Sequence, residues 1–122
     1  MASLEIYGAG QEVGRSCFVL ETDKRIMLDV GLKIHNKKDP HLYPLYNKQK
    51  IDLVVLSHAH LDHVGYLPAV FESNSVPVIA TPPTKEIGEL LLLDSAKIIL
   101  SEYRTLPYKR QSHMKAMQSF WL

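Results

Sequence analysis

The stretch Ile51-Asp52-Leu53-Val54-Val55-Leu56-Ser57-His58-Ala59-His60-Leu61-Asp62-His63 decides both the fold and the chemistry of this chain. Its first half, residues 51–56, is a short and nearly continuous apolar run, which is typical of a strand buried inside an α/β sheet. Its second half places three histidines and one aspartate directly after that strand. Because α/β proteins place their sites in loops at strand ends, the stretch predicts a functional loop at a sheet edge.

Upstream of this stretch, the sequence pattern predicts strands and turns. Residues 4–7 begin a strand that breaks at Gly8-Ala9-Gly10, residues 15–21 form the next strand, and residues 25–28 return after a hairpin turn at 22–24. The glycines at 8, 10 and 14 only superficially resemble a dinucleotide fingerprint, because a strand rather than a helix follows them. We expect them to form a backbone turn near the histidine loop.

Downstream, helices alternate with a further strand. Residues 62–72 have helical spacing of apolar side chains, although Pro68 weakens the middle, and residues 77–80 suggest a strand. Thr81-Pro82-Pro83 can open a long helix, which the 3.6-residue period extends to about Tyr103. Together these patterns predict an α/β fold of layered α+β character.

Composition narrows the class of protein. The chain has 122 residues, 46% of them hydrophobic and 22% charged, which suits one folded core and excludes a disordered tail. Its net charge of +1 excludes a strongly basic protein. The longest aliphatic run, residues 90–93, is too short for a membrane span, and residues 1–10 lack a signal region, so we expect a cytoplasmic protein. The single cysteine, Cys17, cannot form an internal disulfide and is expected to be a small buried side chain.

The four clustered side chains have spacings that suit metal binding. With one cysteine available, any metal must be held by histidines and carboxylates. His58 and His60, two apart on an extended segment, project to the same side and can chelate one ion, while Asp62 and His63 begin a helical turn and point to a neighbouring position. Imidazole and carboxylate ligands suit Zn²⁺, and two ions about 4 Å apart can clamp a phosphodiester for hydrolysis.

These residues also carry a family resemblance. The pattern His-x-His-x-Asp-His at 58–63, followed by Gly65, resembles the signature motif of the metallo-β-lactamase superfamily. Residues 8–17 (GAGQEVGRSC), Asp29-Val30-Gly31 and Pro82-Pro83-Thr84 are similar to the β-CASP nucleases, and most similar to archaeal and eukaryotic nuclease subunits of the cleavage and polyadenylation specificity factor type. The resemblance covers essentially the whole chain.

The resemblance implies a fold, a cofactor and a substrate. The fold would be the N-terminal half of an αβ/βα sandwich, the cofactor two zinc ions, and the substrate RNA. His58 and His60 would bind the first zinc and Asp62 and His63 the second, with Asp62 also orienting the attacking water. Asp29 matches the aspartate of the family's first motif and would support the histidine loop, although a plain turn residue is the alternative.

The sequence also departs from the family pattern. The family's third-motif histidine, its bridging fourth-motif aspartate and the β-CASP insertion have no counterpart here, and His113 lies in a helical, basic segment where the family has a connecting helix. We therefore expect residues 1–122 to be a partial metallo-β-lactamase domain that is inactive alone. A homodimer or a complementing chain remains open as a source of further ligands.

Two basic segments and their tyrosines offer a weaker prediction. Residues 33–50 carry five lysines against one aspartate, and residues 104–122 carry four basic and no acidic side chains. They predict either an electropositive rim for an RNA backbone or a merely solvated surface. The interleaved tyrosines would suit base stacking, namely Tyr43, Tyr46, Tyr103 and Tyr108.

Two other functions stay in competition with the RNA hydrolase. The first is a different metallo-β-lactamase-fold hydrolase, such as a glyoxalase II-like thioester hydrolase, because the histidine cluster alone serves both; the segment at 8–17 argues against it. The second is a non-catalytic binding or structural module, which the missing ligands favour.

Overall fold

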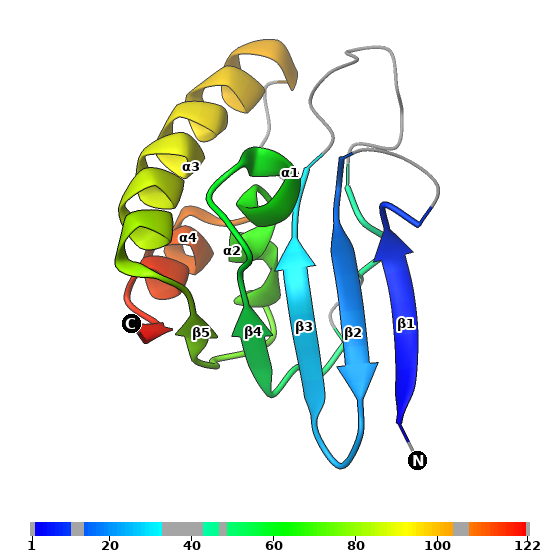
Figure 1. Ribbon diagram of the computed structural model, residues 1–122. Helices are drawn as coiled ribbons and strands as arrows, with labels where there is room; N and C mark the ends of the chain where they lie inside the picture. Colours follow the sequence, from blue (N-terminus) through cyan, green and yellow to red (C-terminus); the bar gives the residue numbers. More distant parts are fainter. Residues whose placement is uncertain (1, 11–13, 33–42, 47–48, 104–107, 122) are drawn as a thin grey trace.

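The computed structural model describes residues 2–10, 14–32, 43–46, 49–103 and 108–121 (Figure 1). Within these residues the chain forms one six-stranded sheet, whose strands lie side by side in chain order, and four helices. The strands are β1 (Ser3–Gly8), β2 (Cys17–Glu21), β3 (Arg25–Val30), β4 (Leu53–Val55), β5 (Val78–Ile79) and β6 (Phe120–Trp121). The helices are α1 (Leu61–Val64), α2 (Leu67–Val70), α3 (Pro82–Tyr103) and α4 (Arg110–Met117). The predicted α/β character is confirmed.

The sheet has an antiparallel part and a parallel part. β1, β2 and β3 pair antiparallel through short connections, whereas β4, β5 and β6 run parallel to β3. Parallel pairing requires a crossover; α1 and α2 lie in the crossover from β4 to β5, and α3 and α4 lie in the crossover from β5 to β6. In Figure 1 the helices gather around the β4–β5 side of the sheet, and β1 and β2 extend away from them. Both β3 and β4 therefore end at the same edge.

The core lies between the sheet and the helices. Cross-strand register aligns Val19, Met27, Val54 and Val78 in one row on the helix side, and none of them is exposed. They pack with buried side chains of the first three helices, namely Val64, Leu67, Val70 and Leu92. Burial of such side chains is the main stabilising contribution to a domain of this size.

The opposite face of the sheet is apolar but not fully covered. Register aligns two further rows across the strands, and each of their side chains is partly or largely exposed. The rows are Leu4, Leu20, Ile26 and Leu53, and Ile6, Phe18, Leu28, Val55 and Ile79. An apolar surface of this extent is typical of an interface.

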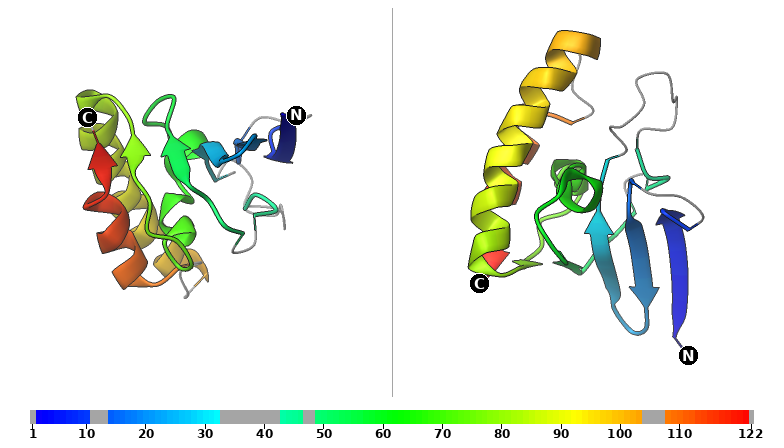
Figure 2. Two further views of the ribbon diagram at one scale, coloured as in Figure 1. Left: turned by 90° about the horizontal axis from the view of Figure 1, so that it is seen from below. Right: turned by 45° about the horizontal axis from the view of Figure 1, so that its top comes forward.

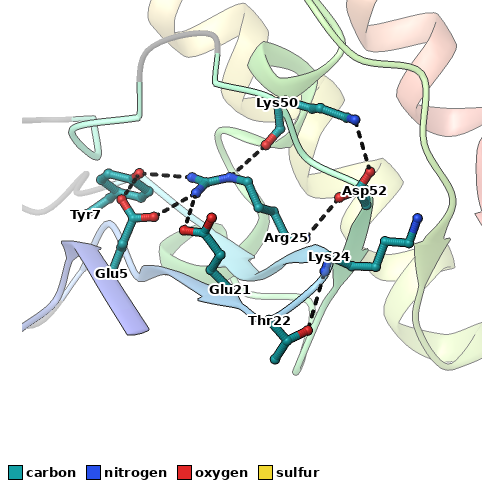
Figure 3. Close-up of polar contacts among 8 residues, drawn as sticks. All are labelled: Glu5, Tyr7, Glu21, Thr22, Lys24, Arg25, Lys50 and Asp52. Carbon is teal, nitrogen blue, oxygen red and sulfur yellow. Dashed lines mark hydrogen bonds and ion pairs between the residues drawn. The ribbon is translucent and has the colours of Figure 1, made fainter. Parts of the chain in front are cut away.

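A polar network holds the part of the sheet that the helices do not cover (Figure 3). The Arg25 guanidinium donates to the carboxylates of Glu5 and Glu21 at 2.8 and 2.9 Å and to the Lys50 carbonyl at 2.9 Å. The Arg25 N–H donates to the Asp52 carboxylate at 2.9 Å, and the Asp52 N–H donates to the Arg25 carbonyl at 2.9 Å. The network ties β1, β2 and β3 to the segment that enters β4.

Two sequence expectations need correction. The helix expected over 62–72 is divided into α1 and α2, because Pro68 cannot donate and the Tyr66 N–H bonds to the Val30 carbonyl at 3.0 Å rather than continuing the helix. The chain also forms β6, which the pattern did not predict. By contrast, α3 begins as expected: the Thr81 hydroxyl accepts from the Thr84 N–H at 3.3 Å. No helix of the described residues is long and apolar enough to cross a membrane.

Candidate metal centre

The site is built where two parallel strands end. β4 leads into Ser57 and the histidine loop, and β3 ends with Asp29 and Val30 at the same edge. Helix α1 begins within the loop and carries Asp62 and His63 in its first turn. A site at the carboxyl edge of parallel strands is the usual arrangement of α/β proteins.

Asp29 is the central acceptor of this loop. Its backbone lies in the left-handed region at φ 62°, which directs its carboxylate toward the loop, and the residue is only 8% exposed. One carboxylate oxygen accepts from the Ser57 N–H at 2.7 Å, and the other lies 2.7 Å from the Ser57 hydroxyl and 2.8 Å from His63 Nδ1. An aspartate in these contacts fixes both the loop backbone and the orientation of one imidazole.

Three of the four predicted ligands come together. Donor atoms of His58, Asp62 and His63 all lie within 4.8 Å of one another. His63 Nε2 is 3.5 Å from the Asp62 carboxylate, and the His58 and His63 ring centres are 3.8 Å apart. His60 lies outside this group, although its ring centre is 4.9 Å from that of His58. Because Asp29 engages Nδ1 of His63, the ring presents Nε2 to the group.

Backbone hydrogen bonds hold the loop against the preceding strands. The Ser16 N–H donates to the Asp62 carbonyl at 2.9 Å, and the Gly31 N–H donates to the Ser16 carbonyl at 2.9 Å. A Cβ atom on Gly31 would lie 1.8 Å from the Asp62 carbonyl oxygen, so only glycine allows this approach. The glycine turn predicted near the histidine loop is confirmed at Gly14, which has φ 99° and lies two residues before Ser16. Sequence reasoning missed the Ser16 contact, because a backbone donor leaves no pattern in side-chain identity.

The remaining candidates lie elsewhere or serve packing. His113 is in α4, where its ring stacks on Tyr108 with centres 6.4 Å apart, and burial lowers its pKa. In the part of the chain that the structure describes, it joins no group of donor atoms. Cys17 is completely buried, as predicted, and burial raises its pKa to about 12. His35 and His41, like most of the basic segment at 33–50, lie outside the described residues.

Two of the four tyrosines that were expected to stack on bases are buried. Tyr46 and Tyr108 are 6% and 4% exposed, so the prediction that they stack on bases is wrong: their rings pack inside the protein. Tyr43 stacks on the ring of Tyr66 with centres 5.0 Å apart. The side chain of Tyr103 lies outside the described set.

Comparison with known proteins places this chain in a family. Residues 10–113 match the metallo-beta-lactamase superfamily. The chain is 40% identical over 115 residues to a probable RNase of Methanocaldococcus jannaschii, covering 91% of this chain and 26% of that protein. It is 39% identical over 108 residues to the transcription termination factor FttA of Methanosarcina mazei, covering 84% of this chain and 17% of that factor. The chain therefore spans about a quarter or less of these relatives' lengths.

A solved structure agrees in fold. ST1585 of Sulfolobus tokodaii, an archaeal metallo-beta-lactamase superfamily protein, aligns with a TM-score of 0.57 at 19% identity. The alignment covers 97% of this chain and 47% of that one, so the likeness extends over nearly all of the sheet and helices described above. The chain belongs to the metallo-β-lactamase superfamily.

Proposed function

We propose that this chain carries the metal-binding loop of an RNA phosphodiester hydrolase of the β-CASP type. The observation that carries the proposal is the group of donor atoms formed by His58, Asp62 and His63, in which the Asp29 carboxylate contacts Nδ1 of His63. Relatives named as a ribonuclease and as a transcription termination factor support RNA as the substrate class. Because the chain spans 26% and 17% of those two proteins, the activity is proposed for this loop when the remaining ligands are supplied.

The donor set fits zinc. Two imidazoles and a carboxylate are among its usual ligands, and ligand distances near 2.1 Å bring donor atoms to roughly 3.4 Å from one another around one ion. The donors already converge to within 4.8 Å, so small side-chain rotations suffice. His60, which lies beside His58, is the fourth proposed ligand, and the complete site would hold two ions, as the family resemblance implies.

Each residue then has a proposed task. Zinc, when bound, supplies Lewis-acid polarisation of a phosphodiester oxygen and lowers the pKa of water. The Asp29 carboxylate holds the His63 ring in one orientation through Nδ1 and holds Ser57 through two contacts. The Asp62 carboxylate, 3.5 Å from His63 Nε2, orients the attacking water. A supporting carboxylate of this kind raises the basicity of the histidine as a ligand.

Metal stoichiometry and RNA cleavage test the proposal. Elemental mass spectrometry of the purified chain should find zinc, and His63→Ala should remove it, whereas His113→Ala should retain it. A version extended by the downstream part of a relative should cleave RNA but not S-lactoylglutathione. Cleavage of the thioester alone would favour the glyoxalase II-like alternative. Zinc retained in full by His63→Ala would contradict the ligand assignment.

A second proposal concerns what completes the site. We infer that a complementing polypeptide covers the apolar face of the sheet, whose nine side chains are aligned across five strands. Leu4 and Ile6 at its edge are 55% and 54% exposed, which is costly for an uncovered surface. Two sheets pack face to face through such rows, so the partner is expected to offer a sheet with an apolar face. Co-expression with the downstream half of a relative should protect this face from a hydrophobic dye and restore cleavage, whereas unchanged dye binding would contradict the inference.

A further inference from the structure

Helix α3 has a second apolar face that points away from the protein. Its inner face is buried through Thr84, Gly88, Leu92, Ser95 and Ile99. Its outer face carries Leu90, Leu93 and Leu100 at 68%, 49% and 40% exposure. The helix lies at the outer edge of the molecule, on the side away from β1 (Figures 1 and 2). Isolated exposed leucines need no explanation, but several on one helix face indicate a contact surface.

The spacing on this outer face follows a heptad. Leu90, Leu93, Lys97 and Leu100 are separated by three, four and three residues, and Glu86 precedes Leu90 by four. At 100° per residue all five lie within about an 80° arc of the helix. Residues at this spacing form the contact seam when two helices pack through knobs and holes. Both charged members of the seam, Glu86 and Lys97, are exposed.

The order of charges along the seam selects the partner. When the helix is laid antiparallel on a copy of itself, Leu90 faces the partner's Leu93, and Glu86 then faces the partner's Lys97. The same contacts recur on the other side of the two-fold axis, so two apolar layers lie between two pairs of opposite charges. A parallel arrangement would instead place Glu86 against the partner's Glu86 and Lys97 against the partner's Lys97. A surface that is complementary to itself under a two-fold rotation is what a symmetric dimer requires.

A hollow borders the seam. It has a volume of about 300 Å³ and is lined by Leu93, Lys97 and Leu100 of α3 and by Met114 of α4, among others. Met114 is 55% exposed. From these observations we propose that the outer face of α3 is a homodimer interface, in which the α3 helices of two copies pack antiparallel through Glu86, Leu90, Leu93 and Lys97. The contact is small, so the dimer should be weak and should form reversibly with concentration.

Charge reversal tests this interface without disturbing the core, because both charged residues are exposed. In sedimentation experiments up to about 1 mM protein, the wild-type chain should dimerise, and more weakly at high salt. Glu86→Lys and Lys97→Glu should each weaken the dimer about tenfold or more, because each places like charges at two symmetric positions. The double variant Glu86→Lys/Lys97→Glu should restore the wild-type dissociation constant to within about threefold.

The matched control reverses a charge at a distant exposed site. Lys24→Glu, in the turn between β2 and β3, should leave dimerisation unchanged, and circular dichroism should show that all variants keep their helix content. A chain that remains monomeric at every concentration would overturn the proposal. So would association that ignores both single reversals, because that would place the contact elsewhere, for example on the apolar face of the sheet.

Discussion

Replacing Asp29 offers the sharpest test of how the site is held together. Its carboxylate receives three short contacts, from the Ser57 N–H, the Ser57 hydroxyl and His63 Nδ1, and the residue is nearly buried. Hydrogen bonds to a charged group are each worth about 1.5–3 kcal/mol. Asp29→Asn keeps the shape and one acceptor, so we expect it to lower the free energy of unfolding by about 1–2 kcal/mol and to weaken zinc binding by about 10- to 100-fold.

The left-handed backbone at this position separates side-chain from backbone effects. Asp29→Ala leaves the Ser57 N–H without its acceptor and places an alanine at φ 62°, so the loss should be about 3–5 kcal/mol. Asp29→Gly loses the same contacts but tolerates the backbone, and should be about 1 kcal/mol more stable than Asp29→Ala. Metal-free urea unfolding gives the free energies.

A zinc competition assay with a chromophoric chelator gives the affinities. The exposed carboxylate of Asp94 provides the control, because Asp94→Asn should change neither quantity. If Asp29→Asn bound zinc within about twofold of the wild type, the aspartate would not orient His63, and its role would be that of a plain turn residue. Equal stabilities of the alanine and glycine variants would refute the argument from backbone conformation.

Three further predictions follow from other contacts. Gly31→Ala should lower the free energy of unfolding by at least about 2 kcal/mol and should weaken zinc binding, because the new Cβ would displace the Asp62 carbonyl. Urea unfolding measures the first effect, and the zinc competition assay measures the second. Cys17 should resist iodoacetamide at pH 8 in the folded chain and react once unfolded, because burial raises its pKa to about 12. The hydrogen bond from the Arg25 N–H lowers the pKa of Asp52 in the folded chain below its ordinary value of 3.8. The stability from this contact is therefore complete above pH 3.8 and is lost as the pH falls through the lowered pKa of the folded chain. Urea unfolding at several pH values should show that Asp52→Asn loses less of its free energy of unfolding in acid than the wild type does.

The elements that the sequence predicted well are those whose pattern is local. The strand at 53–55 follows from one apolar run, and the start of α3 follows from a threonine before two prolines. β6 escaped prediction because it has only two residues and depends on parallel pairing with β5, which is distant in the chain. The division between α1 and α2 depends on a tertiary hydrogen bond from Tyr66 to Val30, which no local pattern encodes.

At the site, the sequence identified the clustered residues but did not predict their backbone conformation or the burial of two tyrosines. The spacing predicted a pair formed by His58 and His60 beside a second pair formed by Asp62 and His63, whereas the structure groups donor atoms of His58 with those of Asp62 and His63. The left-handed conformation of Asp29 was not predictable from composition, because most aspartates adopt ordinary backbone angles. The burial of Tyr46 and Tyr108 was also hidden, since a tyrosine among lysines has the same local pattern whether its ring faces solvent or the core.

The unusual backbone angles explain how the loop can be shaped before a metal binds. Arg15 and Asp29 both have positive φ, and each lies in a segment that is hydrogen-bonded to the histidine loop or to its neighbouring residues. Such angles cost of order 1–3 kcal/mol per residue and persist only where surrounding contacts determine them. Here the contacts are backbone hydrogen bonds, from Arg15 to the Leu32 carbonyl at 3.1 Å and from Ser16 to the Asp62 carbonyl at 2.9 Å. Since these bonds involve no atom of a proposed ligand side chain, the backbone scaffold of the loop is formed by the chain itself.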